Sequence, residues 1–277
     1  MKQLRLVSVL LAAVISVVAE AQVPIMDDAF LKCSYEYKSV KDSVKHEQKE
    51  DLVLLLIGKS HSAFYSYYTF QTDSLRLSPD YQIKWRQAFL TAFQKDGAAA
   101  TNFYFRRLTS YTYKDFLLNT IKTYDDVNNS LFVYEDTLDA QQWELMDSIK
   151  IVLGYNCQKA ETVYHGRIWT AWFAADIPID NGPWKLGGLP GLIMEAYDAN
   201  NEHHFTMNGL QQVNHTPIID KSKEGKYKRT TRIKFLKAKR DFEENSARII
   251  QAQTDVSLDF DASSKTIHRD YLETDYK

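Results

Sequence analysis

Cysteine, proline and glycine are all scarce in this sequence. Of its 277 residues, two are cysteine, six are proline and ten are glycine, whereas aromatic residues make up 13%. Few chain-breaking residues and many aromatic ones favour β-strands over disorder. The sequence also lacks an internal repeat and any linker rich in Pro, Gly and Ser. We therefore predict that residues 22–277 form a single β-rich domain, with a basic and then helical C-terminal segment from about residue 221.

An excess of charge of one sign is lacking too. The formal net charge is −2, and a nearly neutral surface argues against nucleic acid as a partner. One local excess lies between Lys221 and Arg240, where ten side chains are Lys or Arg. This basic segment could meet anionic lipid or lipopolysaccharide, although a solvated face is the simpler interpretation.

Long hydrophobic runs are absent beyond the N-terminus. There, Lys2 and Arg5 precede the apolar run from Leu6 to Val18, and Ala19-Glu20-Ala21 has the form of a cleavage site. The run of about 13 residues is short of the roughly 20 that a membrane-spanning helix needs. We predict a signal peptide over residues 1–21, cleaved near Ala21 and Gln22, a periplasmic or secreted location, and no transmembrane segment in the mature chain.

The two cysteines, Cys33 and Cys157, admit two interpretations. An exported chain meets an oxidising compartment, where they could form a disulfide. The sequence alone does not tell whether their Cα atoms lie within bridging distance. Alternatively, Cys157 could be a nucleophile beside a base such as His165, although a structural role is simpler.

Metal and cofactor motifs are missing. The sequence has no HExxH, CxxC, EF-hand, GxGxxG or Walker pattern, and no GxSxG elbow. The best metal candidates are His203, His204 and His215, but adjacent residues on a strand face opposite ways. We therefore predict no metal and no cofactor, and assign no catalytic residue.

Alternating and continuous apolar runs predict an antiparallel β-protein. Strands are expected near residues 29–37, 52–57, 64–68, 102–107, 109–113, 121–124, 131–135, 143–146 and 149–153, and again at 192–198 and 203–210. Helices are expected over 81–95, after a Ser-Pro-Asp start, and over 241–253. The predicted fold is mainly β with some α: a curved antiparallel sheet or incomplete barrel with one or two helices packed on its concave side.

The stretch from Gly166 to Asp198 is the densest in special residues. It starts as a strand whose two faces differ little in polarity, which predicts cover on both faces. The turn Asn181-Gly182-Pro183 follows, then a second extended piece, a Gly/Pro corner and another strand. The residues chosen here as binding candidates are Arg167, Trp169, Trp172 and Trp184. For Arg167 the alternative is a stem packed on the sheet with a paired head group.

Within this stretch lies the hexapeptide Gly188-Leu189-Pro190-Gly191-Leu192-Ile193. Together with Trp169-Thr170-Ala171-Trp172, Gly182-Pro183-Trp184 and Gly154 to Ala160, it resembles the GLPGLI family of secreted bacterial proteins. The resemblance covers roughly Tyr35 to Asp198 and implies secretion by Gram-negative bacteria and a mostly β domain. In the structural interpretation the hexapeptide forms a bend and fills the core. In the alternative, its glycines let a ligand approach the backbone.

Two functions follow as hypotheses. The first is a non-enzymatic envelope protein that holds an apolar, lipid-like or amphiphilic ligand in an aromatic-lined cavity, or docks to an envelope partner; this predicts a closed apolar cavity without converging titratable groups. The second is a periplasmic hydrolase or thiol enzyme using Cys157 and a histidine, which predicts a reduced, partly exposed Cys157 beside a base.

Overall fold

A computed structural model describes residues 24–42, 47–96, 106–128, 130–138, 141–253 and 271–276. The predicted signal peptide and most of the strand expected at 102–107 lie outside these residues. Among the described residues, no helix is long and apolar enough to cross a membrane.

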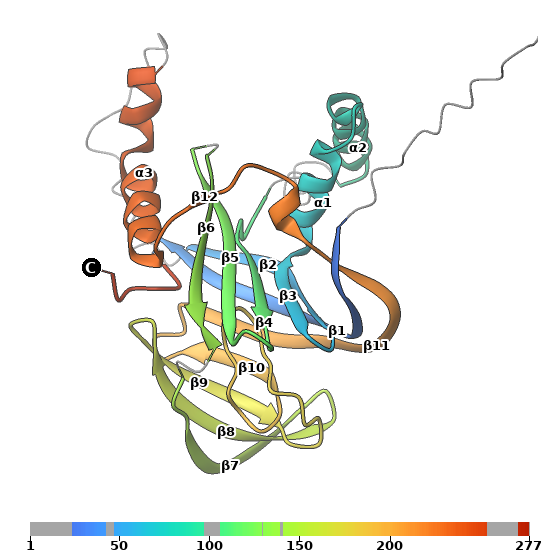
Figure 1. Cartoon of the computed structure of the whole chain (residues 1–277), viewed down its shortest axis with the longest axis vertical. Coiled ribbons are helices and arrows are strands. Elements are labelled where there is room, and N and C mark those ends of the chain that lie inside the picture. The colour runs from blue at the N-terminus through green and yellow to red at the C-terminus, as the bar shows by residue number, and fades with distance from the viewer. Residues whose placement is uncertain are drawn as a thin grey trace, which may run out of the picture.

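The described chain is built on one open sheet of twelve strands (Figure 1), in the order β12-β6-β5-β4-β3-β2-β1-β11-β10-β9-β8-β7. All neighbours are antiparallel except β12 and β6. The strands are β1 (Ile25–Asp42), β2 (Glu47–Ile57), β3 (His61–Ser66), β4 (Tyr111–Asp115), β5 (Thr120–Val127), β6 (Ser130–Thr137), β7 (Glu144–Val152), β8 (Tyr155–Tyr164), β9 (Arg167–Ala174), β10 (Leu192–Asp198), β11 (His203–Ile219) and β12 (Lys228–Arg229).

This confirms the prediction of a mainly β fold with some α. The sheet is open, however, because its edge strands β12 and β7 stand at opposite ends of the strand order. Two predicted strands, 143–146 and 149–153, are parts of the single bulged strand β7. The second extended piece expected from Trp184 is irregular backbone, so no strand lies between β9 and β10.

The helices are α1 (Tyr67–Arg76), α2 (Tyr81–Asp96) and α3 (Arg232–Gln253), with a short 3-10 helix, η3 (Lys221–Lys223). The helix predicted over 81–95 is confirmed. Helix α1 was missed because Tyr67 and Tyr68 continue the aromatic pattern of β3. The hydroxyl of Ser66 caps its N-terminus by accepting a bond from the Thr69 amide, at 3.2 Å, and this cap starts the helix.

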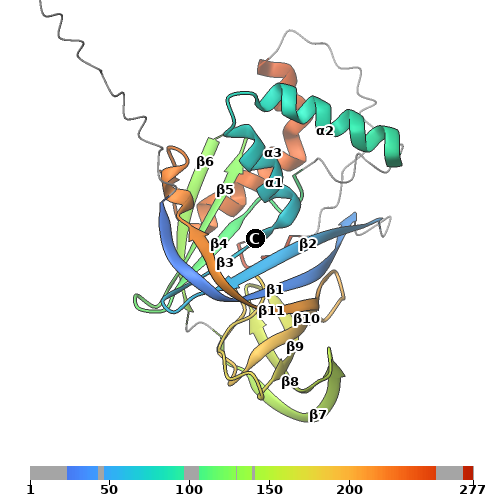
Figure 2. The same cartoon turned by 90° about the vertical axis from the view of Figure 1, so that its right-hand side faces the viewer.

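The helices were predicted on the concave side of the sheet, but they contact both of its faces. Helix α3 packs Phe235 against Tyr134 of β6, whereas α1 packs Phe70 against Tyr65 on the other face of β3. Helix α2 extends beyond the sheet (Figure 2). Its residues Tyr81, Trp85 and Phe89 are half-buried, and Ile83 is 61% exposed, so these side chains lie outside the buried core.

Each face of the sheet carries its own core cluster. The larger contains Tyr35, Leu55 and Phe64 together with Trp169 and Phe173 from the distant strand β9. The smaller is built around residues of β1 to β5 and β11, namely Ala29, Leu56, Ala63, Tyr111, Tyr113, Tyr124 and Ile218.

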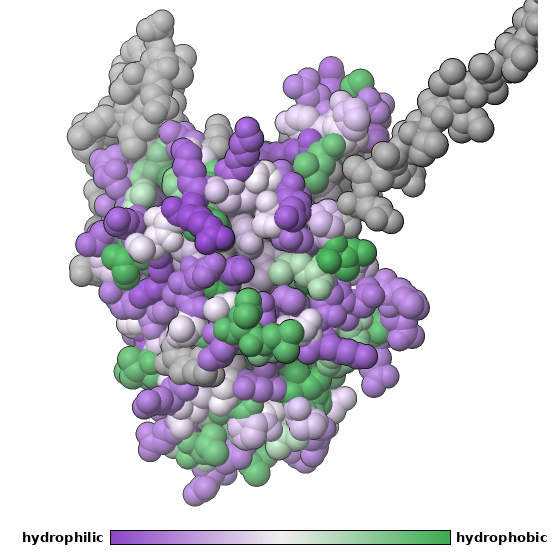
Figure 3. Space-filling view, in the orientation of Figure 1, coloured by the Kyte–Doolittle hydropathy of each residue, from purple (hydrophilic) through white to green (hydrophobic). Residues whose placement is uncertain are grey.

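The outer side of β7, β8 and β9 remains partly open to solvent. Ile149 of β7, Val163 of β8 and Ile168 of β9 are each more than half exposed. Within β9 Ile168 is the one exposed residue, and Thr170 and Ala174 on the same side are buried, so the expectation that β9 is covered on both faces holds for most of the strand. Figure 3 shows hydrophobic groups interspersed with polar residues over this part of the surface.

Candidate binding cavity

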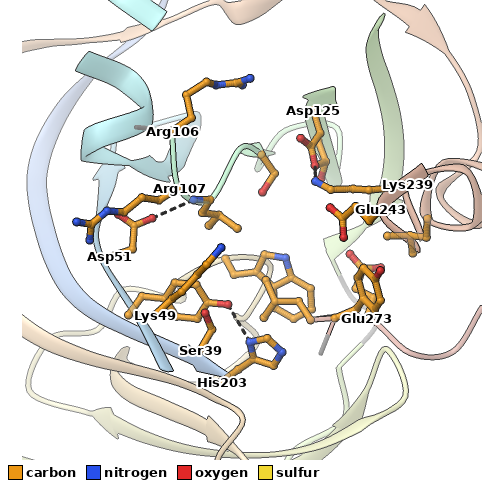
Figure 4. A pocket seen from close by; sticks show the side chains of 18 of the residues that line it. Ser39, Lys49, Asp51, Arg106, Arg107, Asp125, His203, Lys239, Glu243 and Glu273 are labelled. Atoms are coloured by element: carbon orange, nitrogen blue, oxygen red, sulfur yellow. Dashed lines mark hydrogen bonds and ion pairs between the residues drawn. The ribbon is translucent and has the colours of Figure 1, made fainter. Parts of the chain in front are cut away.

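A large open cavity of about 790 Å³ lies on the face that carries the larger core cluster. Its walls come from β1, β2, β5, β6, β11, α3, the loop before β10 and the C-terminal segment 271–276. Aromatic rings contribute one part of its lining, from Tyr37, Tyr134, Trp184, Phe235 and Tyr271. Charged groups contribute another, from Lys49, Glu50, Asp51, Arg106, Arg107, Asp125, Lys239, Glu243 and Glu273 (Figure 4).

Asp51 is buried at one side of the cavity, where β2 begins its buried part. Its carboxylate accepts a bond from the Ser66 hydroxyl at 2.9 Å and one from the Leu108 amide at 3.1 Å. Burial raises the pKa of Asp51 to about 6, and these donors only partly offset that effect. The side chain therefore joins β2 to the start of α1 and to the segment before β4.

Asp125 stands across the cavity from Asp51 (Figure 4). It accepts bonds from the Thr109 hydroxyl at 2.6 Å and from the Lys239 ammonium at 2.5 Å. Burial alone would lower the pKa of Lys239, but the charges of Asp125 and Glu243 and the hydrogen bond to Asp125 together outweigh burial, and the pKa is raised. Lys239 therefore stays charged and fixes α3 to β5 at the cavity wall.

A buried ion-pair network forms the floor beside Trp184. The Lys185 ammonium, fully buried, donates to Asp136 at 2.7 Å and to Glu273 at 2.6 Å. Arg232 of α3 also donates to Glu273, at 2.7 Å. Burial would raise the pKa of Glu273, but Lys185 and the other neighbouring cations lower it. The network thus holds β6, the loop before β10, α3 and the C-terminal segment together.

The C-terminal segment completes this wall by pairing with the turn between β8 and β9. Arg167 donates to the carbonyl oxygen of Tyr271 at 3.0 Å. The Thr274 amide donates to the His165 carbonyl at 2.9 Å, and its hydroxyl donates to the Gly166 carbonyl at 3.0 Å. Gly166 has a φ of 81°, and an added Cβ would lie 2.4 Å from the Thr274 hydroxyl. Only glycine fits both the turn and this close approach.

His203 closes the cavity at the β11 side. Its Nδ1 lies 2.8 Å from the Tyr37 hydroxyl. Burial, together with the nearby charge of Arg167, lowers the pKa of His203 to about 3, so the imidazole is neutral. The His203 ring, Asp51, Asp125 and Glu273 therefore all have partners within the protein.

The four binding candidates from the sequence do not meet at one place. Trp184 lines the cavity. Trp169 is fully buried and packs against Trp184 with the two rings tilted, their centroids 5.6 Å apart. Trp172 faces the other side of β9, where the Lys150 ammonium lies 4.6 Å from its ring. Arg167 is buried and paired with Asp198 and Glu202, at 2.9 Å and 2.8 Å.

The hexapeptide packs against its neighbours in the sheet. Leu189, Leu192 and Ile193 are buried. An added Cβ on Gly191 would lie 2.3 Å from the carbonyl oxygen of Ala174, so this glycine is needed where the loop crosses the end of β9. The backbone of the hexapeptide at Gly191 therefore packs against the end of β9.

The cysteines are not bridged. Both are free and buried. In the strand order β11, β10 and β9 separate β1 from β8, and four strand spacings of about 4.8 Å far exceed bridging reach. Burial raises the pKa of Cys157 and that of Cys33, the latter to about 12. A thiol enzyme needs a partly exposed and activated cysteine, whereas Cys157 is buried and its pKa is raised.

The candidate metal histidines point apart. His204 Nε2 lies 3.0 Å from Glu195, on the face opposite to His203. A different cluster brings donor atoms of His165, Glu273 and Asp275 within 4.8 Å of one another. Arg232 donates to both of these carboxylates, so the cation that this cluster holds is a guanidinium.

Most cavity residues were not singled out by the sequence. Asp51, Asp125 and Lys239 lie far apart in the chain, and each sits beside ordinary strand or helix residues. The usable signal was position: Tyr37 occupies an inward place in an alternating run, and Asp51 directly precedes the apolar run from Leu52 to Ile57. That pattern identifies the face of a strand but not the strands that meet across it.

The molecule thus combines an open antiparallel sheet with a polar cavity edged by aromatic rings. A family model described as "N-glycanase peptide, N-terminal domain" matches residues 117–235, which is less than half of the chain. None of the curated proteins matches.

Two solved structures of PNGF-II are similar in fold. The one in space group P21 has a TM-score of 0.52 and 12% sequence identity, and the match covers 76% of this chain and 33% of that one. The one in space group C2 has a TM-score of 0.48 and 12% identity, over 75% and 32% of the two chains. The chain therefore spans about a third of the length of the structures it resembles, and the likeness is one of fold.

Proposed function

We propose that the chain binds a glycan and that the large cavity is its binding site. The observation that carries the proposal is the lining, which combines aromatic rings with hydrogen-bonding and charged side chains. A sugar offers apolar C–H faces to such rings and hydroxyl groups to such donors and acceptors. A cavity of about 790 Å³ also has the size usual for sites that enclose a small organic ligand.

The charged lining weighs against the apolar cargo considered from the sequence. Asp51, Asp125 and the half-buried Lys239 keep their partners within the protein, but their charged groups would lose their remaining hydration if an acyl chain filled the cavity. A hydroxyl-rich ligand can replace the lost water, because each hydroxyl both donates and accepts.

The comparisons support a glycan as the class of ligand, but they give no support for a catalytic activity. The matched region, residues 117–235, contains β5, β6 and the loop before β10, and it supplies Asp125, Tyr134, Trp184, His203 and Phe235 to the cavity. The name of the matched family refers to N-glycans, and we carry over only that class of ligand. The GLPGLI resemblance has a different basis and stays a prediction.

Binding without cleavage is the simpler form of the proposal. Asp51 and Asp125 are held by Ser66, Thr109 and Lys239, and Cys157 is a buried thiol of raised pKa. The two carboxylates maintain the walls of the cavity, whereas Cys157 is not part of its lining. An enzymatic activity would need a reacting group that is not committed in this way.

The test is calorimetric titration of the purified chain with N,N′-diacetylchitobiose and with a high-mannose N-glycan. Ser39 of β1 lines the cavity, so Ser39→Trp should fill its mouth and abolish binding. Lys38→Trp is the matched control, because it places the same bulk on the opposite face of the same strand. Absence of binding, or equal binding by both variants, would refute the proposal.

Incubation with a high-mannose glycoprotein distinguishes binding from hydrolysis in the same preparation. We expect no shortening of the glycoprotein by mass spectrometry. Release of the glycan, abolished by Ser39→Trp and retained by Lys38→Trp, would instead identify the cavity as an active site.

We also propose that the protein is exported, which would bring it to extracellular or periplasmic glycans. This rests on the sequence of residues 1–21. Intact-mass analysis of the protein secreted from a Gram-negative host should give an N-terminus at or next to Gln22. Recovery of full-length protein with Met1 retained would contradict it.

A further inference from the structure

A second cavity, of about 220 Å³, lies on the opposite face of the sheet. Its floor follows a cross-strand row in which Lys32 pairs with Leu56, Leu56 with Ala63, and Ala63 with Tyr113. Paired residues point to the same face. Because Ala63 is the one small side chain between two large ones, the row has a hollow above its Cβ.

The walls of this hollow are apolar. Leu54 and Tyr65 form the next row of the floor. Phe70 of α1 stands over Tyr65, with ring centroids 5.1 Å apart. Pro217 and Ile219, near the end of β11, complete the rim. An apolar cavity of this kind gains by holding an apolar group rather than water.

Two phenols supply the polar contacts. Neither the Tyr65 nor the Tyr113 hydroxyl has a hydrogen-bond partner among the described residues. Burial raises the pKa of Tyr65 to about 12, and burial together with the charge of Glu224 raises the pKa of Tyr113 well above its usual value. Both hydroxyls are therefore protonated and can donate to a ligand.

The charged groups at the rim are unequal. Lys221 is paired with Glu224 and lies 4.1 Å from the centroid of the Tyr111 ring. Lys32 has no ion pair and no side-chain hydrogen bond within the described part of the chain. With two ammonium groups and one carboxylate lining it, the cavity has an excess positive charge at the end of the Ala63 row.

We propose that this cavity is a second binding site, and that it takes a small carboxylate with an apolar body about the size of one aromatic ring. The ring lies over Ala63 between Leu56 and Tyr113, and the carboxylate faces Lys32 and the phenol hydroxyls. The site shares no lining residue with the glycan cavity and does not depend on that proposal. Its volume limits it to one ring and a short chain, because cavities of about 150 Å³ already hold benzene.

Three probes of equal shape test it: phenylacetate, 2-phenylethanol and 2-phenylethylamine. Each is titrated into the full mature chain, and the methyl groups of Leu54 and Leu56 are followed by NMR. We expect saturable shifts with phenylacetate, weaker binding of the alcohol and at least tenfold weaker binding of the amine. No methyl shift with phenylacetate at millimolar concentration overturns the site, and equal affinities for the three probes overturn its preference for a carboxylate.

Two variants locate the contacts. Ala63→Leu fills the hollow and should abolish the methyl shifts. Lys32→Gln, at a half-buried rim position, should weaken phenylacetate about fivefold, as expected for a partly exposed charge pair. Lys38→Gln, on the same face of β1 but away from the cavity, is the control and should bind as the wild type does. Wild-type affinity in a folded Lys32→Gln protein overturns the role of Lys32.

Binding at this site should also be independent of the glycan cavity. Ser39→Trp should leave the response to phenylacetate unchanged. A joint loss of both responses in that variant would overturn the claim that the two sites are separate.

Discussion

Lys114 should make the stability of the protein increase with pH above neutrality. Its side chain reaches from β4 into the loop before β10 and is 2% exposed. The ammonium donates to Asn181 Oδ1 at 2.7 Å, to the Gly182 carbonyl at 3.2 Å and to the Leu186 carbonyl at 2.5 Å. Burial lowers the pKa of Lys114 to about 7, and Asp180 opposes the shift.

The sign follows from proton counts. Between the folded pKa, near 7, and the unfolded value of 10.5, the unfolded chain binds more protons at Lys114 than the folded chain does. The free energy of unfolding therefore rises with pH across this window. From pH 7 to pH 9.5 the rise amounts to at most about 3 kcal/mol, at about 1.4 kcal/mol per pH unit. The three oxygens around the ammonium favour its charged form, so this is an upper limit.

The assay is urea unfolding of the wild type and of Lys114→Met at pH 7, 8, 9 and 9.5. Methionine keeps the length of the side chain and does not titrate. Cysteines and tyrosines titrate in both proteins, so the difference between the two free energies isolates Lys114. We expect that difference to increase with pH in favour of the wild type. A difference that is flat or that decreases would refute the reasoning.

Three further predictions concern single positions. Gly166→Ala should lower the free energy of unfolding by about 2–4 kcal/mol, because it combines positive-φ strain with a clash against the C-terminal segment. Gly154→Ala is the control: Gly154 has a similar φ and nothing within 4 Å, so this variant should lose only about 1 kcal/mol. Equal losses of the two variants in thermal unfolding would contradict the clash. Arg167→Met should destabilise by about 3–5 kcal/mol, because it leaves buried carboxylates without their cation, and a loss below 1 kcal/mol in urea titration would show that the pairing matters little. Cys33 and Cys157 should both be unreactive to a thiol reagent in the native protein and give two thiols on denaturation, whereas a count of zero thiols would reveal a disulfide.

Much of the sheet could be predicted from local sequence pattern. The run from Leu52 to Ile57 and the aromatic alternation after His61 gave the β2–β3 hairpin, and residues 81–95 gave α2, because these signals lie within a few residues of one another. The secondary-structure predictions were wrong where tertiary contacts, and not the local pattern, determine the structure. Helix α1 replaces a strand pattern at Tyr67 because Ser66 caps it there.

The cavity could be predicted much less. Of the four binding candidates, Trp184 alone lines the cavity. The candidates were chosen because they lie in one stretch that is dense in special residues, and that criterion does not identify the residues that face a cavity. The groups that shape its walls, including Asp51, Asp125 and Lys239, meet only because β2, β5 and α3 are brought together by the strand order. A sequence pattern that repeats every second residue carries no information on that order.

The strand order divides the sheet into two meanders, β1 to β6 and β7 to β11, which are joined mainly by the long pairing of β1 with β11, while the two-residue strand β12 adds a short pairing with β6. Within each meander most pairings link neighbours in sequence, whereas this seam unites residues from opposite ends of the chain. Closing it costs the most chain entropy, so we expect it to form late in folding. The two halves should then behave as separate folding units, and a chain cut between β6 and β7 should reassemble from its fragments along that seam.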